Sequence, residues 1–174
     1  MQQLEQVFAG PTFSTRYLRA ADGESLQMLA ELCTDYYQLT SGLPPGPAES
    51  QSFFIALPPS FGYDSKHLMG IYAGNNSLIG VVDIIANYKE PGEWTLGLLM
   101  LAPEHRNNGL GTSVFTELQK WAQEQGAHTI RIGVMEDNTA AVAFWTKLGF
   151  TLSESKPMKM GIKDNTCLVM KKQI

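Results

Sequence analysis

Residues 104–113 read EHRNNGLGTS and place an arginine and two glycines just before a helical pattern. A helix N-terminus has unpaired N–H groups and the positive end of the helix dipole, so it binds anions, and phosphates above all. Glycine lets a phosphate approach the backbone without meeting a Cβ atom. These residues predict a phosphate cradle, although a glycine-containing turn beside a solvated arginine fits them too. The predicted cradle consists of Arg106, Asn107, Asn108, Gly109, Leu110, Gly111 and Thr112.

Two other phosphate-binding loops fit the sequence less well. A Walker loop needs a lysine followed by Ser or Thr after its last glycine, and no Gly-Lys-Ser/Thr occurs. The dinucleotide fingerprint is closer, because Gly109 and Gly111 open a helix and Glu136 and Asp137 end the next strand. Its third glycine is replaced by Val114, and the βαβ repeats that should follow are missing. We therefore disfavour both loops.

Composition limits the classes of protein. The 174 residues are 44% hydrophobic and 17% charged, which is typical of one soluble globular domain spanning 1–174. A formal net charge of −4 argues against nucleic acid as the main partner. Membrane association is not expected, because no apolar run reaches the roughly 18 residues of a membrane span. Cys33 and Cys167 have no metal-type spacing, and without a signal-peptide pattern we expect a cytoplasmic protein with no metal.

The spacing of apolar residues alternates between helical and strand types along the chain. Helices are expected over residues 22–40, 48–57, 110–125 and 138–148. Strands are expected over residues 15–20, 67–73, 77–88, 94–102 and 128–136, and in a closing hairpin around 163–165. This order predicts an α/β (α+β) fold in which a mixed, mostly antiparallel sheet of six to seven strands is flanked by about four helices.

Two stretches resemble signatures of one family. MLAPEHRNNGLGTSVFTEL (100–118) resembles the acetyl-CoA signature Gln/Arg-x-x-Gly-x-Gly/Ala of the GNAT superfamily of N-acetyltransferases. NTAAVAFWTKLGF (138–150) resembles its second signature, with an Asn helix cap, an aromatic pair and a terminal Gly-Phe. Both the order and the separation of the two signatures match. The resemblance implies a sheet split near its middle and an enzyme that transfers acetyl from acetyl-CoA to a primary amine of a small molecule or peptide.

The resemblance also implies which residues bind acetyl-CoA beyond the cradle. In the family, the strand before the cradle carries a bulge, and the pantetheine arm lies in the resulting gap. Leu99, Met100 and Leu101 match the backbone that pairs with pantetheine, and one of their N–H groups would polarise the thioester carbonyl. A buried central strand explains the same run without a function. The second signature adds Asn138, Phe144 and Trp145, although Asn138 could be a helix cap alone.

The chain departs from the family at the general base. Several members have a glutamate where this sequence has Thr95. Glu93 lies two residues earlier, on the same side of an extended strand. Asp83 interrupts an apolar run, where a carboxylate is unfavourable unless it is paired or solvated. Asp83 and Glu93 are therefore the candidate bases, and each is alternatively a structural acid.

A second departure concerns the acid that protonates the leaving thiolate. Many members have a tyrosine where this chain has Trp145, and an indole N–H does not act as an acid near neutral pH. We expect Trp145 to act through its shape. Tyr36, Tyr37 and Tyr88 are alternative donors.

The acceptor is the least determined part of the prediction. Residues 33–37 and 41–47, Tyr88 and the terminal hairpin are expected to line its site, but they do not identify it. The departures at Thr95 and Trp145 keep open an alternative, a non-catalytic acyl-CoA-binding or sensor protein of the same fold. A homodimer is also left open.

Overall fold

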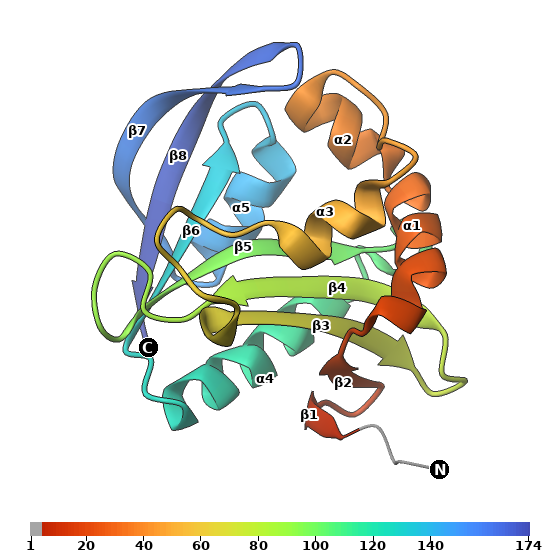
Figure 1. Ribbon diagram of the computed structural model, residues 1–174. Coiled ribbons are helices and arrows are strands. Elements are labelled where there is room, and N and C mark those ends of the chain that lie inside the picture. The colour runs from red at the N-terminus through yellow and green to blue at the C-terminus, as the bar shows by residue number, and fades with distance from the viewer. Residues whose placement is uncertain (1–4) are drawn as a thin grey trace.

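A computed structural model describes residues 5–174, in which one eight-stranded sheet is covered by helices on both faces (Figure 1). The strands lie in the order β1-β2-β3-β4-β5-β6-β8-β7. Among the described strand pairs, only β5–β6 is parallel. The strands are β1 (Gln6–Ala9), β2 (Phe13–Tyr17), β3 (Lys66–Ala73), β4 (Leu78–Ile85), β5 (Glu93–Leu101), β6 (Thr129–Met135), β7 (Thr151–Met160) and β8 (Lys163–Gln173).

Five α-helices flank the sheet. Three of them, α1, α2 and α3, cover one face, and α4 and α5 pack on the other. Within residues 5–174, no helix is long and apolar enough to cross a membrane. The helices are α1 (Gly23–Leu32), α2 (Thr34–Ser41), α3 (Glu49–Ile55), α4 (Leu110–Glu124) and α5 (Thr139–Lys147), and the short 3₁₀ turns are Ala20–Asp22, Tyr63–Ser65 and Pro103–His105.

The predicted fold class is confirmed, with more elements than expected. The additional strand is β1, which pairs antiparallel with β2. The additional helix arises because the first predicted helix is divided at Cys33. The hydroxyl of Thr34 donates to the carbonyl of Glu31 at 2.7 Å, and the Cys33 carbonyl accepts the N–H of Tyr36 at 3.0 Å, which begins α2. A hydroxyl bonded to a preceding carbonyl competes with continuation of the helix. The segment predicted as one helix over residues 22–40 therefore forms α1 and α2.

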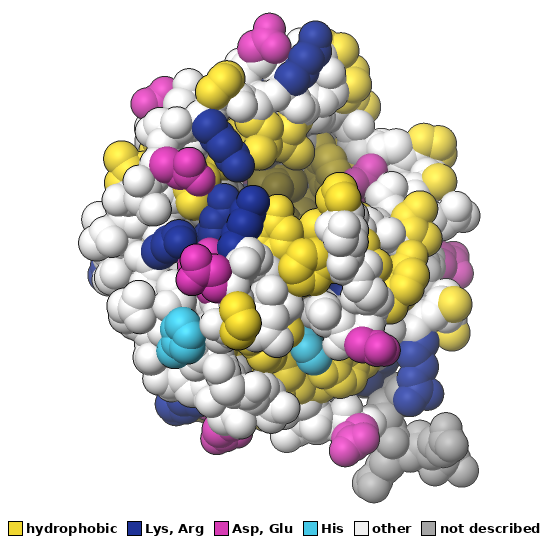
Figure 2. All heavy atoms as spheres, turned by 60° about the vertical axis from the view of Figure 1, so that its left-hand side comes forward, with side chains coloured by type: hydrophobic (Ala, Val, Ile, Leu, Met, Phe, Trp, Pro, Cys, Tyr) yellow, Lys and Arg dark blue, Asp and Glu magenta, His cyan; other side chains and the backbone are white. Residues whose placement is uncertain are grey.

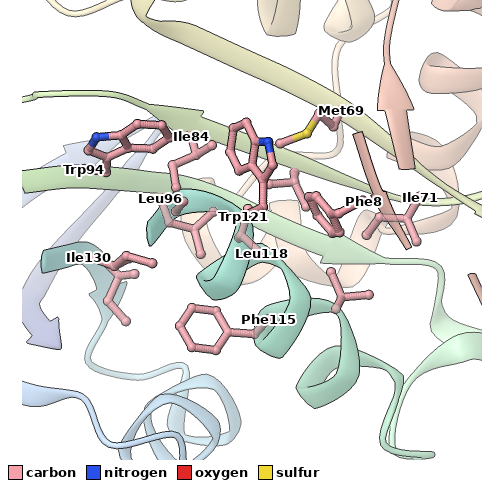
Figure 3. Close-up of a cluster of buried hydrophobic side chains, with 14 of the residues drawn as sticks. Phe8, Met69, Ile71, Ile84, Trp94, Leu96, Phe115, Leu118, Trp121 and Ile130 are labelled. Atoms are coloured by element: carbon pink, nitrogen blue, oxygen red, sulfur yellow. The ribbon is translucent and has the colours of Figure 1, made fainter. Parts of the chain in front are cut away.

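The α4 face of the sheet is a continuous apolar core. Phe115, Leu118 and Trp121 project from α4 towards Ile84 and Leu96 of the central strands (Figure 3). These side chains recur at three- and four-residue spacing, which places them on one stripe of the helix. Their burial fixes α4 against the sheet, and with it the loop that precedes α4.

The predicted split lies between β5 and β6. The two strands pair only from Glu93–Leu96 to Thr129–Ile132, although both continue beyond that point. On the other side of β5, Asp83 pairs with Leu98 while Ile84 pairs with Leu96, so Gly97 is an extra residue. One extra residue is a β-bulge, which bends its strand and disrupts pairing. The bulge thus turns β5 away from β6 and opens the sheet.

Candidate active site

A cleft passes through the sheet where β5 and β6 separate. It encloses about 130 Å³ and is lined by residues 96–99 of β5 and 132–135 of β6. Tyr36 and Thr40 of α2 close it from one face of the sheet. Asn138, Ala141 and Trp145 close it from the other face.

Two glycines that sequence reasoning did not select mark the point of separation. Gly97 and Gly133 follow the last β5–β6 pair, and both are exposed although their strand neighbours are mostly buried. An added Cβ at Gly133 would lie 3.1 Å from the Sγ of Cys167, so any larger residue there would have to displace that side chain of β8. An isolated glycine inside a strand pattern indicates a bulge or a close approach, and this signal could have identified both positions.

The N-terminus of α4 offers free backbone donors in a separate hollow of about 450 Å³, which is lined by Asn108, Gly109, Leu110 and Ser113 among others. Gly109 has φ +85°, and nothing lies within 4 Å of the position its Cβ would take. The side chain of Asn108 accepts the N–H of Leu110 at 3.1 Å. The N–H groups of Gly109, Gly111 and Thr112 have no acceptor among the described residues. An anion such as a phosphate fits this arrangement of open space and convergent donors.

Gly111 has a second reason to be glycine. Its Cβ would lie 3.3 Å from the Cζ of Phe144, which is tighter than most side-chain contacts, and at an ordinary contact distance of 3.7 Å from Leu101. The absence of a side chain therefore lets α5 approach the first turn of α4. Sequence reasoning assigned Gly111 to the phosphate alone, because the contact joins residues far apart in the chain.

The guanidinium of Arg106 is hydrogen-bonded to neighbouring protein groups. Its Nε donates to the carbonyl of Leu101 at 2.8 Å, and its two terminal nitrogens donate to Asp35 of α2 at 2.5 and 3.3 Å. Arg106 lowers the pKa of the Asp35 carboxyl through these bonds. Arg106 thus connects the end of β5 to α2, and its contact with a phosphate stays a prediction.

The last residues of β5 have one free edge. Leu99, Met100 and Leu101 pair with β4, but they lie beyond the residues that pair with β6. Their side chains pack into the two cores, as expected for a buried central strand. Backbone groups on the open edge can also pair with an extended ligand, so both roles are compatible.

The second signature forms one wall of the cleft. The side chain of Asn138 accepts the N–H of Ala141 at 3.2 Å and therefore caps α5. Trp145 is 8% exposed and meets Phe115, Phe144 and Phe150 edge-on at 4.8–5.5 Å between ring centroids. Its surroundings are consistent with the expected role in shape.

The two candidate bases lie in different places. Asp83 stands opposite Leu98 at the bulge and pairs with the buried Lys66 amine at 2.6 Å, while its second oxygen has no partner among the described residues. Burial raises the pKa of Asp83, and Lys66 partly opposes that shift. Glu93 lies at the closed end of the β5–β6 pair, 2.8 Å from Lys171. Asp83 is the register partner of the cleft residue Leu98 but is not part of the lining, whereas Glu93 lies at the end of β5 away from the cleft.

The three tyrosines are also separated. Tyr36 lines the cleft, and burial raises the pKa of its hydroxyl. Tyr37 packs edge-on against it at 5.4 Å but is outside the lining. Tyr88 lies in the β4–β5 loop, 5.2 Å from the ring of Phe61.

Comparisons with known proteins agree with this geometry. The family model of the acetyltransferase (GNAT) family matches residues 26–150. An uncharacterized N-acetyltransferase of Bacillus subtilis (strain 168) is 37% identical over 73 residues, which are 42% of this chain and 28% of that relative. The chain thus aligns with under a third of that relative's length.

Solved structures share the fold. A probable acetyltransferase of the GNAT family from Chromobacterium violaceum has a TM-score of 0.79 at 19% identity, covering 98% of this chain and 87% of that one. A spermidine N-acetyltransferase from Vibrio cholerae, solved with CoA and spermine, has a TM-score of 0.74 at 16% identity, covering 94% and 96%. At these identities the likeness establishes the fold alone.

The cradle is tested by two nearly isosteric variants at its open position. Gly109→Asn and Gly109→Asp both suit a positive φ better than other side chains do, and they differ by one negative charge. We expect Gly109→Asp to weaken CoA binding at least tenfold relative to Gly109→Asn, because it repels the pyrophosphate from the free N–H groups. Calorimetric titration with CoA measures the difference.

Gly126 provides the matched control for the cradle. It has φ +97° and nothing within 4 Å of its Cβ position, but it follows the opposite end of α4. Gly126→Asp should leave CoA affinity unchanged. Equal affinities of the two Gly109 variants would show that the pyrophosphate binds elsewhere.

Proposed function

Because the chain belongs to the acetyltransferase (GNAT) family, we propose that it transfers an acetyl group from acetyl-CoA directly to a primary amine of a small molecule or a peptide. Two observations carry this proposal: the cleft through the sheet, and the free N–H groups at the N-terminus of α4, whose first turn packs against Phe144 and Leu101. Acetyl-CoA is a substrate that supplies its acetyl group as a thioester. We assign one face of the cleft to acetyl-CoA and the opposite face to the acceptor amine.

The cradle and the open edge of β5 hold acetyl-CoA in this proposal. Gly109, Gly111 and Thr112 donate N–H groups to its pyrophosphate, and residues 99–101 pair with its pantetheine arm. A backbone N–H at the bulge polarises the thioester carbonyl, on which negative charge develops during attack. Positioning both substrates in one narrow cleft supplies much of the rate enhancement.

We assign the role of general base to Asp83. An alkylamine has a pKa near 10, so at neutral pH it must lose a proton before it attacks. One oxygen of Asp83 has no partner among the described residues and is therefore available to accept a proton. The hydroxyl of Thr95, on the same face of the sheet, also has no described partner and is available to bond the water that carries the proton. The proton passes from the amine through water to Asp83. Its raised pKa brings this carboxylate closer to the pH at which it works.

We assign protonation of the departing thiolate to Tyr36. Its hydroxyl is protonated at neutral pH, because the ordinary pKa of tyrosine is about 10 and burial raises it further. Tyr36 lies across the cleft from Trp145, which occupies the family's tyrosine position. A thiol with a pKa of about 8.5 also leaves without full assistance, so this contribution is the smaller of the two.

The function itself is tested by thiol release. Acetyl-CoA is mixed with a panel of primary amines, and free CoA thiol is measured with and without each amine. We expect amine-dependent release for at least one class of amine. CoA binding by calorimetry without release from any amine would instead favour the non-catalytic acyl-CoA-binding protein.

Asp83→Asn should lower kcat/KM about 10²–10⁴-fold and remove the acid limb of its pH profile. The single variant strands a buried lysine charge, which costs about 3–5 kcal/mol of stability. The double variant Lys66→Gln/Asp83→Asn removes both charges and should lose activity equally. Lys66→Gln alone should move the acid limb to higher pH, because Asp83 loses the cation that lowers its pKa. Wild-type kcat/KM in the folded double variant would exclude Asp83.

Tyr36→Phe should lower kcat about 10²-fold while the Kd for CoA is unchanged, because only a proton donor is removed. Tyr37→Phe is the matched control, since its ring lies beside Tyr36 but outside the cleft lining. An alkaline limb from Tyr36 would lie above its ordinary pKa of about 10, so kcat at neutral pH is the measure. Equal kcat values in the two variants would show that solvent, and not Tyr36, protonates the departing thiolate.

A further inference from the structure

Arg131 is a mostly buried cation whose guanidinium makes only long contacts with other side chains of the described residues. It lies on β6 two residues before Gly133, which lines the cleft, and both face the side of the sheet that α2 covers. Its side chain is 10% exposed, yet within the described residues the guanidinium donates no hydrogen bond. A guanidinium has five N–H donors. Its nitrogens are not among the buried atoms without a partner, so solvent reaches them, and an acceptor that displaces this water can use all five donors.

The contacts around Arg131 are long. Its nearest carboxylate is Glu154 at 3.7 Å, and that side chain is 57% exposed. The centre of its guanidinium lies 5.9 Å from the ring of Tyr88. Neither contact matches the bidentate geometry at 2.7–2.9 Å that arginine forms with a carboxylate. Glu154 is free to move into water when a ligand arrives.

Further cations face the same side of the sheet. Lys171 of β8 is the register neighbour of Arg131 on β6, and Glu93 neutralises its charge. Lys156 of β7 has no carboxylate within ion-pair distance among the described residues. Figure 2 shows a hollow with hydrophobic side chains at its base and a group of Lys and Arg side chains along one rim. Although the formal net charge of the chain is −4, Lys and Arg side chains gather along this rim, with Asp and Glu side chains between them.

We infer that the acceptor carries a carboxylate close to its amine, as an amino acid does, and that Arg131 binds this carboxylate in a bidentate pair. The inference rests on the proposed function and names its substrate class. Lys156 adds a second positive charge at the rim. The same field disfavours polyamines, whose additional ammonium groups would be repelled.

The position of Arg131 suits this role. Two residues along a strand span about 7 Å, and the arginine side chain is long enough to return towards the cleft. The amine of an α-amino acid is separated from its carboxylate by one carbon. A carboxylate held at Arg131 therefore leaves the amine at the mouth of the cleft, beside Gly133 and the bulge of β5. Fixing this second group orients the nitrogen for attack.

The test compares each amino acid with its carboxamide and its decarboxylated amine, using thiol release from acetyl-CoA. We expect kcat/KM for the preferred amino acid to exceed that of its amide at least tenfold. Arg131→Gln should lower kcat/KM for the amino acid about 10–100-fold, as expected for lost charged hydrogen bonds, and change that of the amide less than about threefold. Arg131→Lys should retain part of the preference, because it keeps the charge but not the fork.

Lys159→Gln is the matched control. It removes one positive charge from the opposite face of β7, and it should leave the preference intact. Thermal unfolding of each variant separates a loss of stability from a loss of carboxylate preference. Equal use of amino acids and amides by the wild type, preference for spermidine, or equal losses on both substrates in Arg131→Gln would overturn the inference. No release with any amine would overturn the proposed function as well.

Discussion

The parting of β5 from β6 is the constraint on which the rest of the site depends. Two parallel strands pair for four residues and then separate, because Gly97 adds one residue to β5. The separation leaves one edge of β5 without a β6 partner in the middle of a sheet, where backbone groups are otherwise satisfied. It also opens a passage between the two helical layers. A sheet without this bulge would have a closed centre and no place for two substrates to meet.

The elements around the passage are held by contacts between distant parts of the chain. Gly111 lets Phe144 pack against the first turn of α4, so the two sequence signatures touch directly. Arg106 joins the Leu101 carbonyl to Asp35 at the start of α2. The cradle, the end of β5 and the helix that carries Tyr36 therefore form one connected unit. Arg106 therefore also positions α2, a role that the sequence did not indicate, while its contact with a phosphate stays a prediction.

The two faces of the sheet differ in polarity. The face under α4 is largely apolar around the central strands, with His67 packed between Trp94 and Trp121, whereas the other face carries Lys66, Asp83, Glu93 and Arg131. Buried charges are expensive unless they are paired, and three of these four side chains have partners at 2.6–2.8 Å. Arg131 stands apart from this pattern. The polar face is where proton transfer and recognition of a charged acceptor are possible, while the apolar face supplies the rigidity.

The sequence alone determined the fold class, the order of its main elements and the start of α4 at the glycine-containing stretch, because periodicity, glycine spacing and helix caps act over short distances. It did not reveal β1, whose four residues carry too little pattern, nor the break at Cys33. Asp83 and Glu93 were equivalent as sequence, and only the strand register placed one at the bulge and the other at the closed end. That Arg131 donates no hydrogen bond among residues 5–174 was likewise decided by the tertiary structure, since burial and hydrogen bonding depend on residues brought together from separate strands.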